Sequence, residues 1–381
     1  MLPQLLLIAL GAFASETRRR MVGFLRRKLQ WEFWPAWLAY LPLAPYLLLL
    51  AIRHRSLTLF TAANPGIPSG GFVGESKSAI LKNLSAAGEI VAEWRAIPAA
   101  LTPSAKLAAA RQFIEQRGLT PPVVLKPDVG ERGSGVDIVR SAERMEEYLH
   151  AAEGTVILQR YVPGLEFGVF YYRYPHEARG RIFSITEKRF PHVTGNGHSS
   201  LRQLILGDQR AVCMASAYAQ AARRPLDDIP ASGERVKLVE LGSHCRGAIF
   251  LDGMRYNTPA LEHAIDAVSQ AHAGFFFGRF DIRTPSLEAF QRGEFKVIEL
   301  NGVSAEAAHI YDPSVSLLEA YRVLAQQWRI AFEIGAANRA LGAAPMSLRE
   351  LLRLVSNKLS VPANGSNPQH PAPAEERPAT S

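Results

Sequence analysis

Hard oxygen ligands recur at alternate positions in two apolar segments near the end of the chain. In FGRFDIRT, Asp281 lies among phenylalanines, and in FKVIELN, Glu299 and Asn301 are two residues apart. Because side chains alternate between the two faces of a strand, Glu299 and Asn301 point to the same side. Carboxylate and amide oxygens are the ligands that Mg²⁺ prefers, with water and phosphate completing its shell. The pattern predicts a magnesium site made of Asp281, Glu299 and Asn301.

Arg279 adds a cation to this site. It lies two residues before Asp281 and therefore shares its face of the predicted strand. A guanidinium there can hold a phosphate or a developing oxyanion. The alternative interpretation is a structural cluster of ion pairs among Arg279, Asp281 and Glu299. A buried carboxylate needs a partner in either case, because burial without one is costly.

A second candidate phosphate site lies earlier in the chain. The apolar run PPVVL ends at Lys126 and is followed by the loop PDVGERGSG. Glycines let backbone N–H groups approach an anion closely, and the lysine adds a fixed positive charge. The loop residues concerned are Gly130, Gly133, Ser134 and Gly135. The segment predicts a cover for a polyphosphate, and the alternative is an ordinary hairpin loop.

The next strand ends in QRYVPGLE, which predicts a nucleoside site. Gln159 and Arg160 would lie beside a purine, and the backbone at Tyr161 and Val162 would offer its N–H and C=O groups. Glu166, after a Pro-Gly turn, would accept hydrogen bonds from ribose hydroxyls. A hairpin turn followed by a strand with one exposed acid is the alternative.

Taken together, KP…G…GSGV, QRYVPG-E, GRFD and IELN resemble the ATP-grasp superfamily, including D-alanine–D-alanine ligases and the glutathione-type and cyanophycin-type synthetases. The resemblance covers roughly residues 70–340. It implies an α+β fold in which antiparallel sheets of two subdomains grip ATP. It also implies a ligase that uses ATP and Mg²⁺, or Mn²⁺, to join a small-molecule carboxylate to an amine through an acyl phosphate.

The resemblance also implies roles for individual residues. Catalytic positions are implied for Arg279, Lys188 and Arg189, and metal ligation for Asp281, Glu299 and Asn301. Nucleotide contacts are implied for Lys77, Lys126, Gly130, Gly133, Ser134, Gly135, Gln159, Arg160, Tyr161, Val162 and Glu166. The chain departs from the family at Gln159, where an acid is usual, and in the loops at 242–247 and 304–313. The acceptor half of the site is therefore specific to this protein.

The elements that must position these residues alternate irregularly. Strands are predicted at 123–126, 136–140, 155–160, 166–174, 181–187, 236–241, 248–251, 275–283 and 295–300. Helices are predicted at 75–84, through most of 83–122, and at 142–151, 200–206, 210–223, 260–272 and 313–340. A short strand is expected near the start of 57–72. Without a regular β-α-β rhythm, an α+β fold with antiparallel sheets is favoured over a doubly wound one.

The front of the chain predicts membrane association. Residues 33–52 contain no charge and are about as long as a bilayer-spanning helix requires. Basic residues flank both ends, and Pro35, Pro42 and Pro45 interrupt the run. A re-entrant or interfacial segment at the cytoplasmic face is therefore favoured over a single crossing. The alternatives are a core helix for this run and, for residues 2–14, a first span or a signal-peptide core.

The length, composition and net charge of the chain limit the class of protein it can be. The chain has 381 residues, 48% of them hydrophobic and 20% charged, which is ordinary for a globular protein. Its two cysteines are too few for a disulfide framework. The net charge of +8 gathers near the front, so no nucleic-acid partner is expected, and nothing specifies an oligomeric state. The predicted divisions are a membrane-associated segment (1–56), a linker and pre-ATP-grasp region (57–120), the ATP-grasp domain (121–345) and a helix end with a proline-rich tail (346–381).

Other readings compete with the ligase. The segment GFVGESKS at 71–78 resembles a Walker A loop with its second glycine replaced by serine. The surrounding sequence does not match that of an independent P-loop. His244, Cys245 and His309 could suggest zinc, although their spacings match no recognised site. At the level of function, the alternatives are an ATP-grasp phosphotransferase, a non-catalytic membrane-tethered ATP-binding module, and a structural α+β domain.

Overall fold

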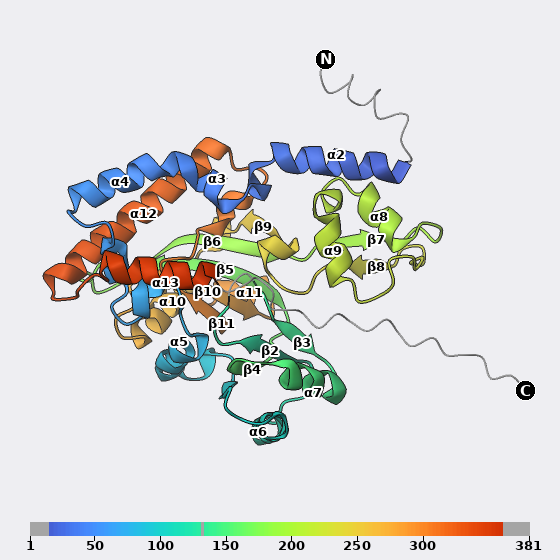
Figure 1. Cartoon of the computed structure of the whole chain (residues 1–381), viewed down its shortest axis with the longest axis horizontal. Helices are drawn as coiled ribbons and strands as arrows, with labels where there is room; N and C mark the ends of the chain where they lie inside the picture. The colour runs from blue at the N-terminus through green and yellow to red at the C-terminus, as the bar shows by residue number, and fades with distance from the viewer. Residues whose placement is uncertain (1–14, 131–132, 361–381) are drawn as a thin grey trace, which may run out of the picture.

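The structure is a computed structural model of the 381-residue chain, and it describes residues 15–130 and 133–360. Its strands form three sheets with antiparallel pairing, and a five-stranded sheet lies at the centre (Figure 1). The strand order of this sheet is β11–β10–β5–β6–β9. Its members are β5 (Leu165–Tyr172), β6 (Arg181–Arg189), β9 (Ile249–Asp252), β10 (Phe277–Thr284) and β11 (Lys296–Asn301). The expected α+β class with antiparallel sheets is confirmed.

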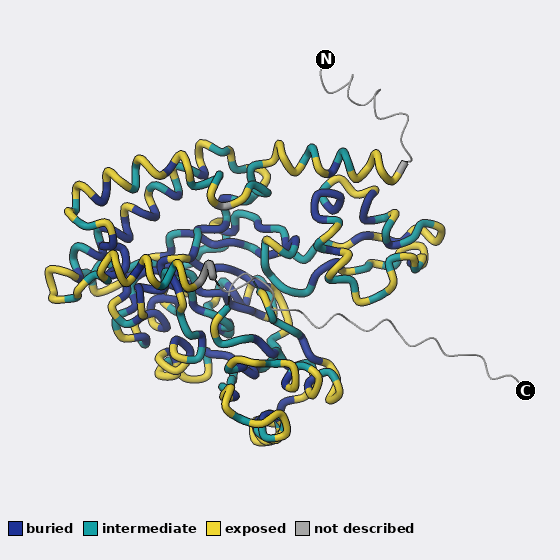
Figure 2. The backbone as a smooth tube through the Cα atoms, in the orientation of Figure 1, coloured by how far each residue is buried: buried dark blue, intermediate teal, exposed yellow. Residues whose placement is uncertain are grey.

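Side-chain alternation divides the central sheet between two apolar cores. On β10, Phe280 and Ile282 belong to a core on one face, whereas Phe277 belongs to a core on the other. The core of Phe280 includes residues of helices α5 (Lys77–Leu84), α10 (Pro259–Ala271) and α11 (Leu287–Gln291). The core of Phe277 includes α4 (Ala44–Arg53), η4 (Leu59–Ala63) and α12 (Leu317–Ala340). With a period of two, Arg279 and Asp281 take the Phe277 side. Figure 2 shows the sheet as the buried centre of the molecule.

A four-stranded sheet lies beside the central one, in the order β1–β4–β2–β3. Its members are β1 (Trp94–Ile97), β2 (Val123–Pro127), β3 (Asp137–Val139) and β4 (Val156–Arg160). One face packs against α6 (Pro103–Gln116) and α7 (Ala142–Ala151), with Leu125 and Leu158 in the shared core. Because Lys126 follows Leu125 on β2, it points to the opposite face.

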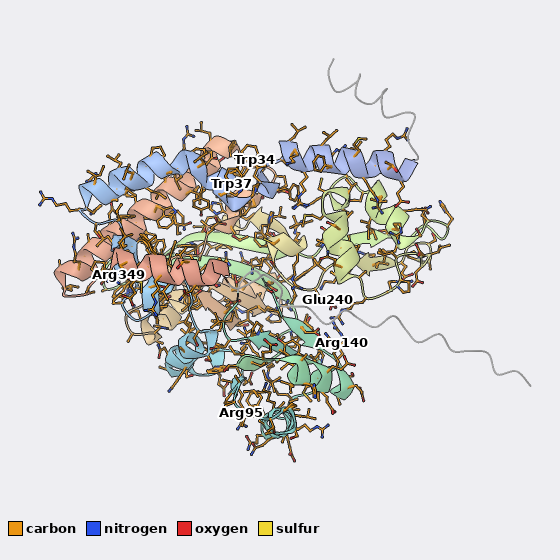
Figure 3. All side chains as sticks on the ribbon, in the orientation of Figure 1. Trp34, Trp37, Arg95, Arg140, Glu240 and Arg349 are labelled. Atoms are coloured by element: carbon orange, nitrogen blue, oxygen red, sulfur yellow. The ribbon has the colours of Figure 1, made fainter. Side chains whose placement is uncertain are left out.

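A small unit completes the fold around the two-stranded sheet of β7 (His192–Thr194) and β8 (Arg235–Lys237). It contains α8 (Leu201–Gly207), η7 (Ala211–Met214) and α9 (Ala215–Ala221), and α2 (Ser15–Leu29) lies across it (Figure 1). A Cβ atom at Gly23 of α2 would come within 2.7 Å of the Val212 carbonyl oxygen, so the close approach requires glycine there. An ion pair of 2.7 Å joins Arg140 at the end of the four-stranded sheet to Glu240 (Figure 3).

The apolar front segment forms short helices on top of the domain. Between Trp31 and Arg53 the chain forms η2 (Trp31–Phe33), α3 (Ala36–Tyr40), η3 (Leu41–Leu43) and α4, and each proline stands at a helix start. Leu43, Leu50 and Ala51 are buried against the domain. Trp37, labelled on this layer in Figure 3, is 71% exposed. Within the described ranges, no helix combines the length and apolarity that crossing a bilayer would take.

One expectation about local structure is wrong, and another is incomplete. The segment 57–72 contains no strand, since η4 packs along α12, where a Cβ at Gly335 would lie 2.3 Å from the Leu59 carbonyl oxygen. The helical prediction for 83–122 omits a strand, because β1 inserts between η6 (Ser85–Ile90) and α6 and pairs with β4. Both departures arise from packing between distant segments. Past α12, helix α13 (Leu348–Ser360) precedes the predicted tail, and that tail and residues 2–14 lie outside the described residues.

A single buried amide ties the front of the domain to β10, and this generates a prediction. Asn64 is fully buried, and its Nδ2 donates to the carbonyl oxygens of Gly70 at 2.9 Å and Phe277 at 2.7 Å. Its Oδ1 accepts from the backbone N–H groups of Phe276 and Phe277, both at 2.9 Å. We expect Asn64→Ala to lower the free energy of unfolding by about 3 kcal/mol, since each buried group left unpaired costs roughly 1–3 kcal/mol.

Urea unfolding followed by circular dichroism measures this change. The matched control is Asn83→Ala on the exposed side of α5, which should stay within about 0.5 kcal/mol of the wild-type protein. Equal effects of the two substitutions would contradict the role given to Asn64.

Candidate active site

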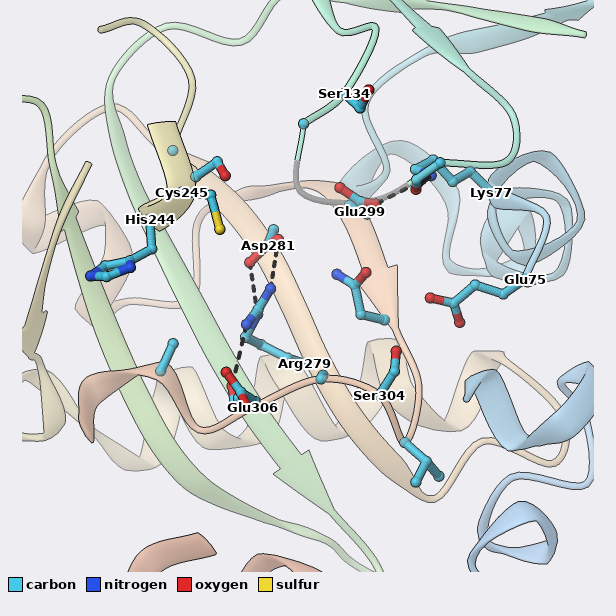
Figure 4. A pocket seen from close by; sticks show the side chains of 18 of the residues that line it. Glu75, Lys77, Ser134, His244, Cys245, Arg279, Asp281, Glu299, Ser304 and Glu306 are labelled. Carbon is cyan, nitrogen blue, oxygen red and sulfur yellow. Dashed lines mark hydrogen bonds and ion pairs between the residues drawn. The ribbon is translucent and has the colours of Figure 1, made fainter. Parts of the chain in front are cut away.

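A cavity of about 1050 Å³ lies between the two large sheets and the layer of front-segment helices and α12. Nearly all the site residues expected from the sequence line it, although they are spread from Lys77 to Asn301. Figure 4 shows its charged end, with Arg279 reaching toward Asp281 and Lys77 toward Glu299. Arg189 and Gly135 are the two expected residues that are not among its lining residues.

The centre of the charged end is the pairing of β10 with β11. In this register Asp281 lies opposite Glu299, and Arg279 lies opposite Asn301. All four side chains line the cavity. Neighbouring strands therefore place the predicted metal ligands and the predicted catalytic arginine together. The antiparallel ladder does this because directly opposed residues share a face of the sheet.

Asp281 is held by two cations. Its Oδ1 accepts from Arg279 Nε at 3.1 Å and lies 2.9 Å from Lys188 Nζ, whereas Oδ2 has a longer contact of 3.4 Å with Arg279 Nη2. Burial alone would raise the pKa of Asp281, but the charges of Arg279 and Lys188 hold it below its usual value. Asp281 is therefore a carboxylate at neutral pH, and Oδ2 keeps capacity for a further ligand.

Glu166, expected to accept from a ribose, is instead ion-paired. Its Oε1 lies 3.0 Å from Lys188 Nζ, and its Oε2 accepts from Arg283 Nη2 at 2.6 Å. All three side chains are almost completely buried. A Cβ at Gly242 would lie 2.0 Å from Glu166 Oε1, so the backbone of that loop lies directly against the carboxylate. Glu166 thus anchors the interior of the cavity as well as lining it.

The two lysines expected to bind phosphate lie near Glu299. Lys126 Nζ donates to the carbonyl oxygen of Ile298 at 3.0 Å, and Lys77 Nζ lies 3.9 Å from Glu299 Oε1. Burial lowers the pKa of Lys126, and the charge of Glu299 opposes that effect. Lys77 begins α5, which Asp128 fixes by accepting from Ser76 Oγ and from the Ser78 N–H. The early lysines and the late carboxylates therefore meet in one cleft.

The glycine-rich loop curves over this cleft. Gly133 and Gly135 have φ values of +75° and +70°, which L side chains rarely adopt. Gly130 and Ser134 line the cavity with Gly133, and the Gly130 carbonyl accepts from Lys77 Nζ. Gly135 packs on Pro127 instead, and its carbonyl accepts from Tyr148. The loop conformation thus depends on glycine at two of the expected positions.

Several hydrogen-bonding groups at the predicted purine site already have partners in the protein. Gln159 is buried and donates to the Ile298 carbonyl at 3.2 Å, while Arg160 pairs with Glu93 at 2.7 Å. The Val162 carbonyl already accepts from Arg283 Nη1 at 2.9 Å. Tyr161 and Val162 nonetheless line the cavity. Gln159 and Arg160 also line the cavity, so their position beside a purine stays a prediction, although both side chains already have hydrogen-bond partners in the protein.

Arg189 lies away from the cleft. It follows Lys188 on β6 and therefore points to the opposite face, where its Nε is 2.7 Å from Glu187 Oε1. Its side chain is 55% exposed. The resemblance placed both basic residues at the phosphate, whereas strand alternation brings in Lys188 alone.

Sequence reasoning missed several residues of the site. Arg283 could have been found, because it stands two residues after Asp281 on the same face. Glu306 accepts from the hydroxyls of Tyr40 at 2.5 Å and Tyr311 at 2.9 Å, and its backbone carbonyl accepts from Arg279. No local sequence pattern indicates a role for Glu306, since its partners Tyr40 and Arg279 lie in distant segments of the chain.

The residues fit a divalent cation by donor chemistry. Among residues 15–130 and 133–360, no group of three or more His, Cys, Asp or Glu side chains could hold a metal. The predicted trio has two acids and one amide, and the Nδ2 atom of Asn301 is buried without a hydrogen-bond partner. An amide flip would present its oxygen there instead. Two carboxylates and an amide suit Mg²⁺, which takes its remaining ligands from water and phosphate.

His244 generates a prediction about pH. Its ring stacks on Tyr311 with centroids 4.6 Å apart and lies 5.3 Å from Phe250. Burial and the charge of Arg210 lower its pKa from 6.5 to about 4. Because the unfolded chain binds this proton more readily, the free energy of unfolding should fall as the pH falls from 6.5 toward 4.

We expect His244→Phe to reduce that acid-induced loss by about 2 kcal/mol, because phenylalanine keeps the ring stack and binds no proton. Denaturant unfolding at several pH values between 4 and 7 measures it. His272 and His309, whose pKa values burial also lowers, remain in both proteins, so the difference isolates His244. Parallel pH profiles for the two proteins would refute the assignment.

The chain is similar over part of its length to synthetases and ligases. No protein-family model matches it. It is 33% identical over 90 residues to a cyanophycin synthetase from Geminocystis herdmanii, a match that spans 22% of this chain and 10% of that relative. The chain thus corresponds to about a tenth of the length of the curated relative it matches.

Three similar solved structures are ligases or synthetases. A bifunctional glutathione synthetase from Pasteurella multocida aligns with 66% of this chain and 35% of its own, at 18% identity and a TM-score of 0.36. The D-alanine-D-alanine ligase from Coxiella burnetii aligns with 79% of this chain and 64% of its own, at 9% identity and a TM-score of 0.39. The VanG D-Ala:D-Ser ligase from Enterococcus faecalis aligns with 72% of this chain and 64% of its own, at 13% identity and a TM-score of 0.36. In the order of its sequence motifs, the chain resembles the ATP-grasp superfamily.

Proposed function

We propose that this protein is a Mg·ATP-dependent ligase that joins a carboxylate to an amine through an acyl phosphate. The observation that carries the proposal is the register of β10 and β11, which sets Asp281 against Glu299 in the cavity that also contains Lys77 and Lys126. Oxygen ligands on one wall and lysines beside them suit a metal–triphosphate complex.

Nucleotide binding would use residues from both large sheets. Lys77, Lys126 and the N–H groups of the glycine-rich loop would hold the phosphates, whose charge favours the protonated form of Lys126. Glu299, Asn301 and Asp281 would hold Mg²⁺, which when bound neutralises phosphate charge and orients the γ-phosphoryl group. Tyr161 and Val162 would border the purine.

The chemical step follows from the position of Arg279. A carboxylate oxygen of the acid attacks the γ-phosphorus, the bond to the β–γ bridging oxygen breaks, and ADP leaves with that electron pair. The amine then attacks the acyl carbon, loses a proton, and inorganic phosphate departs. Arg279, held by Asp281 and the Glu306 carbonyl, lies where it can stabilise the developing oxyanion.

Loss of one metal ligand should abolish turnover. We expect Glu299→Gln to lower kcat at least about 100-fold, because the carboxylate would hold the metal that orients the phosphates. The measurement is ADP and phosphate release after incubation with Mg·ATP and substrates identified by metabolite profiling of a cell extract. Asp281→Ala should be equally inactive, with its fold checked separately because Lys188 and Arg279 lose a partner.

The control is Glu294→Gln, an exposed acid just before β11 that pairs with Arg292 and should keep wild-type turnover. Full activity of Glu299→Gln would contradict the metal assignment. A phosphorylated acceptor without free phosphate would indicate a phosphotransferase instead. Binding of Mg·ATP without turnover across all candidate substrates would indicate a non-catalytic module.

We also propose that the front segment, residues 31–55, binds a membrane surface, with the catalytic domain at its cytoplasmic face. Five large apolar side chains of this segment are between 54% and 71% exposed: Trp37, Leu41, Leu48, Leu49 and Ile52. Arg53 and Arg55 flank them and are also exposed, as are basic residues of α2. Exposed apolar side chains with exposed arginines on the same and the preceding segment suit binding to an anionic lipid surface.

The prediction is that Leu49→Glu combined with Ile52→Glu abolishes sedimentation with vesicles of phosphatidylcholine and phosphatidylglycerol. Each carboxylate opposes insertion of the apolar face and repels the anionic lipid. Binding of the wild-type protein should weaken in high salt and with purely zwitterionic vesicles. The matched control, His263→Glu combined with Ala267→Glu, adds the same charge at exposed positions of α10, which packs on the opposite face of the central sheet from α4, and should sediment as the wild type does. If the wild-type protein fails to sediment with anionic vesicles, the proposal fails.

A further inference from the structure

The cavity has two chemically different ends. One end holds the charged groups around Asp281, and the other is an apolar arm lined by side chains of α4, η4, residue 72 and α12. The apolar arm is defined by Leu47, Ala51, Phe60, Phe72, Trp328 and Phe332. None of the residues proposed to hold Mg·ATP lies in the arm, so the proposed function leaves the arm for another molecule. Ligand sites usually occupy 300–1,000 Å³, and about 1050 Å³ leaves room for a second molecule.

The two ends meet at Glu306 and Arg279. Tyr40 and Tyr311 hold the Glu306 carboxylate from the side of the arm, and the Glu306 carbonyl accepts from Arg279 Nη1 at 3.2 Å. Figure 4 shows Arg279 between Glu306 and Asp281. Arg279 is thus the cation bonded to the residue that Tyr40 and Tyr311 hold. A guanidinium there selects a carboxylate as the head group.

The arm also opens to the surface. Leu48 and Leu57 line the cavity, yet each is 54% exposed. They lie beside the exposed apolar face of α4, where Leu49 and Ile52 are 58% and 67% exposed. A hydrocarbon chain could therefore pass from this face into the arm without crossing a charged region.

We infer that the acid substrate is a long-chain carboxylate, with its hydrocarbon chain in the apolar arm and its carboxylate at Arg279. The inference rests on the proposed ligase function and deepens it. Burial of each methylene is worth about 0.8 kcal/mol, which is about fourfold in affinity. Affinity should therefore rise about fourfold per methylene and level off when the arm is filled.

The test uses straight-chain carboxylates of increasing length with the full-length protein. Hydroxylamine serves as the amine, so that an activated acid is trapped as a hydroxamate while ADP is released. We expect kcat/KM for ADP release to rise about fourfold per methylene and then reach a plateau. Binding of the same acids without ATP, followed by tryptophan fluorescence, should show the same trend, because Trp328 lines the arm.

The two readouts separate the inference from the proposed function. Binding that depends on hydrocarbon chain length, without any ADP release, would overturn the proposed ligase function and leave the arm as a lipid-binding site. Turnover of short polar acids, with no gain from chain length, would overturn the arm assignment and leave the ligase. A chain-length gain with alkylamines in place of carboxylates would overturn the choice of head group.

A variant tests the location of the chain. Ala51→Phe places a ring in the arm, and we expect it to weaken long-chain acids at least tenfold while short-chain acids keep their wild-type kcat/KM. The control is Leu318→Phe, at an exposed leucine of α12 outside the cavity lining, which should keep the wild-type chain-length profile. Leu47→Trp is a second variant should Ala51→Phe not fold, as judged by thermal unfolding. An unchanged profile in folded variants would overturn the inference.

Discussion

Lys188 is the charge on which the cleft depends. Its ammonium lies 3.0 Å from Glu166 and 2.9 Å from Asp281, and it is 4% exposed, so it bridges two buried carboxylates. Arg283 pairs with the other carboxylate oxygen of Glu166, and Arg279 pairs with the same oxygen of Asp281 that Lys188 contacts. An isolated buried carboxylate would be costly, whereas in this chain each acid has two cationic partners. The three cations and two acids leave one positive charge, which suits a site for phosphate.

The central sheet forms part of the apolar core with one face and carries this network of charges on the other. One face of β10 is apolar and supports α10, while the other carries Arg279, Asp281 and Arg283 toward the cavity. The alternation of strand side chains lets a single segment serve both the core and the site. Phe277, at the start of the strand, joins the second core and closes the charged row on the side of α12.

The front segment is a wall of the active site as well as an exposed surface. Tyr40 reaches Glu306, and Ala51 faces the apolar arm from a helix whose opposite side is exposed. The two proposals share the exposed face of this helix, because that face would contact the membrane and also lies beside the opening of the apolar arm. The vesicle assay and the chain-length assay have separate readouts, so each proposal can be tested without the other.

The sequence by itself determined the strands that carry the charged residues and the order of the nucleotide and metal motifs. Periods of two and a glycine-rich loop are local properties, so Asp281, Glu299, Asn301 and Lys126 could be chosen without coordinates. Only the tertiary structure decided that the Val162 carbonyl accepts a hydrogen bond from Arg283, and that β1 joins a sheet from within an expected helical region. It also decided that residues 31–55 form a wall of the cavity. These features depend on pairing between segments far apart in the chain, and no local pattern encodes which distant partner a side chain will meet.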